Sequence, residues 1–113
     1  MISRIWHGWT SHENAAAYEA LLKSEVLPGI QNRHIGGYQR VDLLKRDLGK
    51  EVEFLTILWF DSIAAVREFA GEEYEQAVVP AKARALLARF DAYSQHYDVV
   101  LAMDLKTPSG NGA

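Results

Sequence analysis

Residues 53–60, Glu-Phe-Leu-Thr-Ile-Leu-Trp-Phe, have the composition of a β-strand that is apolar on both faces. Successive side chains of a strand point to opposite faces, and a strand of a small antiparallel sheet usually alternates apolar with polar residues. Here both faces carry large apolar residues: Phe54 and Leu58 on one, and Leu55, Ile57 and Trp59 on the other. A chain of 113 residues has enough helix to cover only one face. We therefore expect a second copy of the chain to cover the other.

The length and charge of the chain limit the number of domains and the kinds of partner that we expect. We expect one domain over residues 1–103 and a flexible polar tail over residues 104–113. The net charge of −3 gives no electrostatic argument for a nucleic-acid partner, and no basic patch or long apolar run predicts a membrane partner. The N-terminus lacks the apolar segment of a signal peptide, and the chain has no cysteine, so we expect a cytoplasmic protein.

The hydrophobic pattern predicts the order β-α-β-β-α-β. The four strands are expected at residues 2–9, 35–44, 51–60 and 93–103. The first helix is expected to begin at a capping box formed by Thr10 and Glu13, and to stop or bend at Pro28.

The second helical region is expected in two parts. A short helix is capped by Ser62 and ended by Gly71, and a longer stretch, interrupted near Pro80, continues to Phe90. This order of elements is that of the α+β, ferredoxin-like fold, a four-stranded antiparallel sheet with helices on one face.

Four segments of the chain carry a family resemblance: residues 1–8, 54–69, 70–72 and 96–100. With this pattern the chain resembles, over about residues 1–102, the antibiotic-biosynthesis-monooxygenase-like proteins of the dimeric α+β barrel superfamily. The resemblance implies a homodimer in which two four-stranded sheets face each other. It also implies a small-molecule pocket in each subunit, between its own sheet and helices.

The resemblance further implies a reaction. The monooxygenases of this family resemble cofactor-free enzymes that oxidise polycyclic phenols or quinols, and the substrate itself supplies the electrons. Such a protein must bind a flat aromatic molecule, remove a proton, stabilise the resulting anion and exclude water. A small aromatic phenol or quinol is therefore the expected ligand.

His96 is the best candidate for the catalytic base, because histidine titrates near neutral pH. It lies on the predicted fourth strand, which flanks the first strand in this fold. A partly buried histidine also commonly has a purely structural role, and the sequence does not distinguish a catalytic from a structural role for His96.

The candidate substrate-binding residues are aromatic or basic side chains on predicted strands: Arg4, Trp6, His7, Tyr38 and Trp59. Strand parity places Arg4 and Trp6 on one face and His7 on the other, but parity does not show which face the helices cover. Arg4 is expected to pair either with an anionic substrate or with an acidic residue across the dimer. Trp59 lines either the pocket or the dimer interface.

No cofactor or metal is expected. The four histidines are scattered, without the spacing of a metal-binding pair on one helix. The haem-degrading branch of the superfamily carries a haem-ligating histidine in the second helical region, whereas residues 61–90 of this chain contain none.

Two other functions are compatible with the same sequence. The first is a non-catalytic dimeric protein that binds a small molecule or is associated with stress, because a fold does not determine a function. The second is an isomerase or lactonising enzyme, which would use the same histidine without oxygen.

Overall fold

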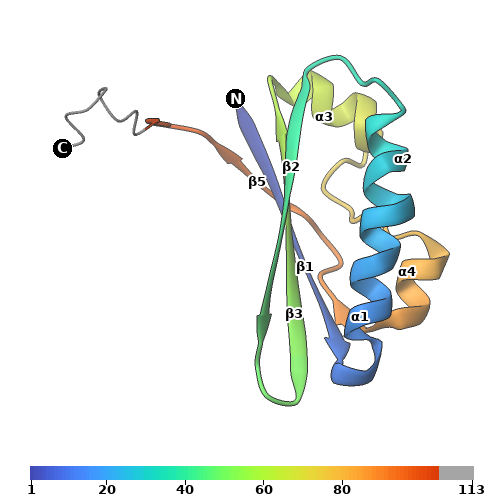
Figure 1. Ribbon diagram of the computed structural model, residues 1–113. Helices are drawn as coiled ribbons and strands as arrows, with labels where there is room; N and C mark the ends of the chain where they lie inside the picture. The colour runs from blue at the N-terminus through green and yellow to red at the C-terminus, as the bar shows by residue number, and fades with distance from the viewer. Residues whose placement is uncertain (105–113) are drawn as a thin grey trace, which may run out of the picture.

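The structure is a computed structural model that describes residues 1–104 (Figure 1). Its elements are β1 (Ile2–Ser11), α1 (His12–Leu21), the π-helical turn η1 (Leu22–Val26), α2 (Leu27–Gln31), β2 (Tyr38–Asp47), β3 (Glu51–Phe60), α3 (Ile63–Ala70), α4 (Ala81–Leu86), β4 (Leu87–Phe90) and β5 (Gln95–Asp98). The predicted tail lies, apart from Asp104, outside the described residues. No helix within residues 1–104 is long and apolar enough to cross a membrane.

The strands form one antiparallel sheet in the order β2-β3-β1-β4, and β5 also pairs with β1. The short strands β4 and β5 therefore share the fourth position, beside opposite ends of β1. This arrangement confirms the predicted α+β fold with a four-stranded antiparallel sheet in ferredoxin-like order.

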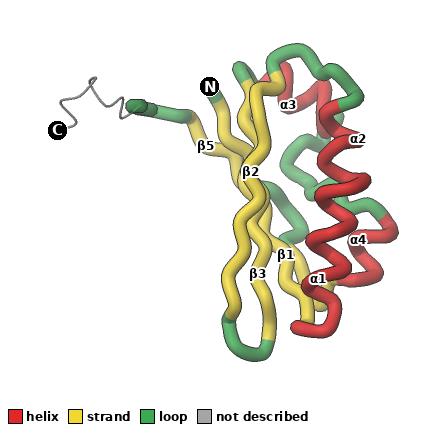
Figure 2. Tube along the Cα trace, in the orientation of Figure 1, coloured by secondary structure: helices red, strands yellow, loops and turns green. Residues whose placement is uncertain are grey.

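All helices lie on one side of the sheet (Figures 1 and 2). Burial along β3 alternates strictly, and the buried residues are Val52, Phe54, Thr56, Leu58 and Phe60. The residues between them are partly exposed on the side without helices, which we call the open face. By register, the open face also holds Ile5, His7, Trp9 and Leu44 beside Leu55, Ile57 and Trp59.

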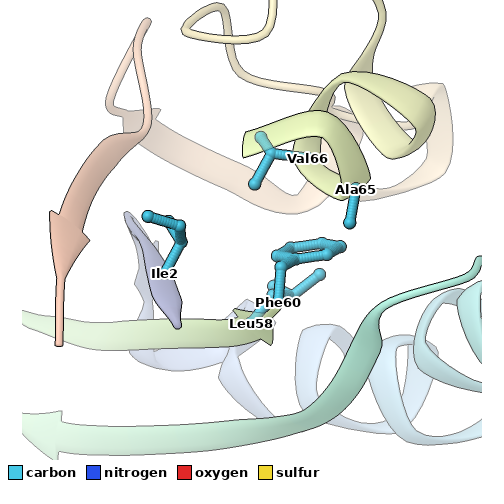
Figure 3. Close-up of a cluster of buried hydrophobic side chains, with 5 residues drawn as sticks. All are labelled: Ile2, Leu58, Phe60, Ala65 and Val66. Atoms are coloured by element: carbon cyan, nitrogen blue, oxygen red, sulfur yellow. The ribbon is translucent and has the colours of Figure 1, made fainter. Parts of the chain in front are cut away.

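Two groups of buried side chains fill the space between sheet and helices. One group joins Ile2, Leu58 and Phe60 of the sheet to Ala65 and Val66 of α3 (Figure 3). The other consists of Tyr18, Leu22, Val52, Phe54 and Ala83. Burying a side chain of the size of leucine or phenylalanine contributes about 1.5–3 kcal/mol, so these groups fix the helices on the sheet.

The first helix has a different cap from the predicted one, and of the two outcomes expected at Pro28 the stop is not observed. Its cap is Ser11, whose hydroxyl accepts from the Asn14 N–H at 3.2 Å, because Thr10 continues β1 and pairs with Val52. Pro28 does not stop the helix. The π-helical turn lies directly before it, and there the Leu27 N–H donates to the more distant Leu22 carbonyl. A widened turn of this kind accommodates a residue that has no N–H to donate.

The predicted element bounds differ more from the structure in the second half of the chain. The helix predicted to reach Phe90 ends at Leu86, because residues 87–90 extend and pair with β1 as strand β4. Residues 72–80 form turns and irregular structure rather than helix. The last strand is shorter than predicted, and β2 begins at Tyr38. By contrast, β3 has the predicted bounds, and Ser62 and Gly71 bound α3 as expected.

Candidate functional site: a cavity between sheet and helices

A small, mostly apolar cavity of about 70 Å³ lies between the sheet and the helices. Its walls come from strands β1 and β3, from the consecutive helical segments α1, η1 and α2, from α3 and α4, and from the irregular segment after α3. The lining residues are Arg4, Trp6, Tyr18, Leu22, Val26, Leu27, Ile30, Thr56, Leu58, Phe69, Val78, Val79, Pro80, Ala83 and Ser94. Val78 is 56% exposed, so the cavity reaches the surface beside residues 78–80.

Arg4 places a guanidinium group in the wall of this cavity although the side chain is only 3% exposed. Its Nη1 donates to the Tyr74 carbonyl and lies 2.9 Å from His96 Nε2, and its Nη2 donates to the Gln76 carbonyl at 3.2 Å. The guanidinium carbon lies 5.4 Å from the centre of the Phe69 ring. Burial lowers the pKa of Arg4 to about 10, and the group remains charged at neutral pH.

His96 lies opposite Arg4, on β5. A guanidinium group can only donate, so His96 Nε2 accepts from Arg4 and the ring proton lies on Nδ1. Burial lowers the pKa of His96, and the charge of Arg4 lowers it further, against a smaller opposing effect of Glu75. His96 is therefore neutral at pH 7. His96 contacts Nη1 of Arg4 and is not among the residues that line the cavity.

Trp6 and Tyr18 give the cavity its aromatic character. Trp6 Nε1 donates to the Asp91 carbonyl at 2.7 Å, which leaves the indole ring as an apolar wall. Tyr18 is 1% exposed and packs edge-on against Phe54, with ring centres 4.8 Å apart. Burial raises the pKa of Tyr18 to about 12. The sequence prediction did not include Tyr18 among the site residues, although its place on the apolar stripe with Leu22 indicates that it faces the sheet.

His7 and Trp59 lie on the open face, across the sheet from the cavity. His7 Nδ1 is 2.8 Å from a carboxylate oxygen of Asp91. Trp59 Nε1 donates to Asp42 at 2.9 Å, and the Arg40 guanidinium lies 5.0 Å from the Trp59 ring centre. The structure thus separates these two residues from Arg4 and Trp6, and their predicted contact with substrate stays a prediction.

Tyr38 lies on the helix side but away from the cavity. Its ring is 5.7 Å from that of Phe60, and it packs against the group of core residues around Phe60. The hydroxyl of Tyr38 is buried without a hydrogen-bond partner among residues 1–104, and burial raises its pKa. Its predicted contact with substrate is not tested by this position.

Within residues 1–104, no three histidine, cysteine or acidic side chains cluster in a way that could hold a metal ion. The lining residues with polar side chains are Arg4, Tyr18, Thr56 and Ser94, besides Trp6, whose indole N–H donates to Asp91. This set can orient a ligand and stabilise negative charge on it.

No family model and no curated protein matches the chain in sequence. Several solved structures match its fold, among them the following three. A putative antibiotic biosynthesis monooxygenase from Bacillus cereus has 12% identity and a TM-score of 0.65, and the match covers 91% of this chain and 96% of that one. A putative antibiotic biosynthesis monooxygenase from Deinococcus radiodurans has 17% identity and a TM-score of 0.63, and the match covers 94% of this chain and 99% of that one. This chain shares their fold.

The third match is Rv0793 from Mycobacterium tuberculosis, with 19% identity, a TM-score of 0.53, and coverage of 93% of this chain and 98% of that one. The predicted resemblance is therefore confirmed for the fold, over more than nine tenths of the chain. At such low identity the likeness extends to no individual site residue.

Proposed function

We propose that the protein is a small cofactor-independent monooxygenase whose substrate, an aromatic phenol or quinol, binds in the cavity between sheet and helices. The observation that carries this proposal is the position of Arg4, a guanidinium group in the wall of an otherwise apolar and aromatic cavity. A cation in such a place favours the anion of a bound phenol over its neutral form. The shared fold with the two monooxygenases named above is consistent with this reaction.

The chemistry divides between Arg4 and His96. Arg4 would bind the substrate oxygen. His96 does not line the cavity, so it would accept the phenol proton only after the Arg4 side chain turns toward the substrate and frees His96 Nε2. The anion gives one electron to O₂, and the two radicals combine into a peroxide anion at a ring carbon that still bears hydrogen. This anion takes back the proton held by His96 and becomes a hydroperoxide. Loss of water then leaves a new carbonyl group, so that one oxygen atom enters the product and the other leaves as water. Trp6 and Phe69 shield the reacting ring from solvent.

A second function, binding without reaction, is favoured by one specific observation. The lone pair of His96 Nε2 is already occupied by Arg4, and the pKa of Tyr18 is raised to about 12, so neither group is a ready base in the ligand-free protein. In that case the protein would carry a small molecule and release it unchanged. Analysis of the small molecules that remain with the purified protein would reveal such a carrier.

We also propose that two copies of the chain associate through their open faces. This face holds Ile5, Leu55 and Ile57 in its centre, in a strand pair that the helices cover only on the other side. Apolar faces of this kind mark association sites, and a pair related by two-fold symmetry is the commonest closed assembly. A second copy would present the same apolar centre and would cover it.

The reaction is tested by incubating the protein with a panel of phenols, naphthols and anthrone-type compounds with and without oxygen. We expect at least one compound to be consumed only in the presence of oxygen, and His96→Ala to slow its consumption. The exposed variant His12→Ala serves as the matched control. The proposal is wrong if no compound is consumed in an oxygen-dependent way, and turnover that needs no oxygen would indicate an isomerase or lactonising enzyme instead.

A further inference from the structure

We infer that the ligand of this cavity is an organic anion, an aromatic or apolar molecule whose carboxylate binds the guanidinium of Arg4. The inference rests on the proposed function only in placing the ligand in the same cavity. It requires no reaction, and it narrows the substrate class from phenols in general to those that carry a carboxylate.

The charge of Arg4 lacks a counterion within residues 1–104. Its three hydrogen-bond partners are the carbonyls of Tyr74 and Gln76 and the neutral ring of His96. No carboxylate of the described residues lies within 4.0 Å of it, although buried charges in proteins are almost always paired.

The exposed arginines of the same chain show the contrast. Arg40, Arg46 and Arg89 each lie 2.8–3.0 Å from a carboxylate oxygen, at sites where water already solvates the charge. Arg33, Arg67 and Arg84 also have no carboxylate within 4.0 Å, but they are exposed to water, whereas Arg4 is the one buried arginine of the described residues. A ligand that brings a negative charge into the cavity would supply a counterion for Arg4, and would gain more there than at the surface because the site is shielded from water.

The unused donors of Arg4 fit a carboxylate. A guanidinium group has five N–H donors, and the three bonds use both N–H groups of Nη1 and one of Nη2. One N–H group remains on Nε and one on Nη2, two nitrogens that are neighbours on one edge of the planar group. Two parallel donors on one edge match the two oxygens of a carboxylate.

A purely structural role for Arg4 makes a different prediction. Its bonds to the carbonyls of residues 74 and 76 fasten the irregular segment after α3 to the sheet. If this were its whole function, the cavity would select ligands by shape and apolar surface, and the charge of the ligand would not matter.

The test is calorimetric titration of the wild-type protein with three single-ring probes of nearly equal shape: benzoate, benzamide and benzylamine. We expect benzoate to bind at least about tenfold tighter than benzamide, and benzylamine not to bind. Arg4→Met should abolish the preference for benzoate, Arg4→Lys should keep part of it through the charge alone, and the control Arg40→Met should leave it unchanged.

The wild-type comparison needs no variant, so a folding defect of Arg4→Met cannot obscure the result. Equal binding of benzoate and benzamide, or binding of neither, would overturn the inference, as would an unchanged preference in a folded Arg4→Met protein. Turnover of neutral phenols together with equal probe binding would overturn the inference and leave the proposed oxygenase intact. A preference for benzoate without any turnover would support the inference and count against the oxygenase.

Discussion

Nη1 of Arg4 lies 2.9 Å from Nε2 of His96, and the two residues face each other across β1 and β5 although 92 positions separate them in the chain. The pair joins a buried cation to a histidine that must stay neutral to accept its hydrogen bond. Arg4 in turn reaches the cavity, whereas His96 does not. Any change at one residue should therefore be measurable at the other.

Arg4→Met should raise the pKa of His96. Burial, the main cause of the lowered pKa, remains in the variant, but the repulsion between the Arg4 charge and a protonated imidazole is lost. Titration of the His96 ring by NMR measures the change, with Arg40→Met, on the open face, as the control. An unchanged His96 pKa in Arg4→Met would show that the two groups are not coupled.

The lowered pKa of His96 also predicts how stability depends on pH. In the unfolded chain His96 takes up a proton near its ordinary pKa of 6.5, whereas in the folded protein it does so only at lower pH. The contribution of a neutral His96 is thus fully present above about pH 6.5 and is lost as the pH falls through the folded pKa. Denaturant unfolding at several pH values should show a smaller loss of stability on acidification for His96→Asn than for the wild type. Equal losses would contradict this prediction.

Ile57 and Leu58 are neighbours on β3 that face opposite sides of the sheet. Leu58 is buried under the helices, so Leu58→Glu should destabilise the fold by several kcal/mol, on the order of 3–5. Ile57 lies on the open face, so Ile57→Glu should leave a folded chain that no longer associates. Light scattering and thermal unfolding of both variants separate these effects. A wild-type monomer at micromolar concentration, or an Ile57→Glu protein that still forms dimers, would count against the proposed association.

Alanine substitutions at two glycines test the backbone conformation of the structure. Gly37 has φ +87°, and a Cβ there would lie 2.8 Å from the Cβ of Ala65, so Gly37→Ala should cost about 1–3 kcal/mol. Gly29 lies within α2 with open space around it, so Gly29→Ala should stabilise the protein by about 0.4–1 kcal/mol. Chemical denaturation measures both changes. If the two substitutions shifted stability in the same direction, the backbone conformation described for one of these positions would be wrong.

The sequence predicted the strands best where turn signals bound them. Both ends of β3 were predicted correctly, because residues 48–50 form the connection before it and Ser62 caps a helix after it. The prediction failed at residues 87–90, where Leu87 and Phe90 continue the helical spacing of Leu86 although the chain extends after Leu86. Pairing with β1 decides this segment, and local periodicity does not report a tertiary contact.

The candidate site was predicted only in part for a related reason. The order of strands placed His96 beside β1, and parity separated Arg4 and Trp6 from His7. Parity could not show which face the helices cover, so Trp59 was left with two possible places and lies on the open face. The hydrogen bonds of Arg4 to the carbonyls of residues 74 and 76 could not be foreseen either, because these residues lie in a segment predicted as helix.

Both the proposed reaction and the inferred anion site require a ligand in the cavity, and a crystal structure of the protein with a bound hydroxybenzoate tests this directly. We predict density in the cavity between Trp6, Tyr18 and Phe69, with the ligand carboxylate within hydrogen-bond distance of Arg4. A ligand bound instead on the open face beside His7 and Trp59 would contradict the account, as would a ligand in the cavity with its anionic group turned away from Arg4.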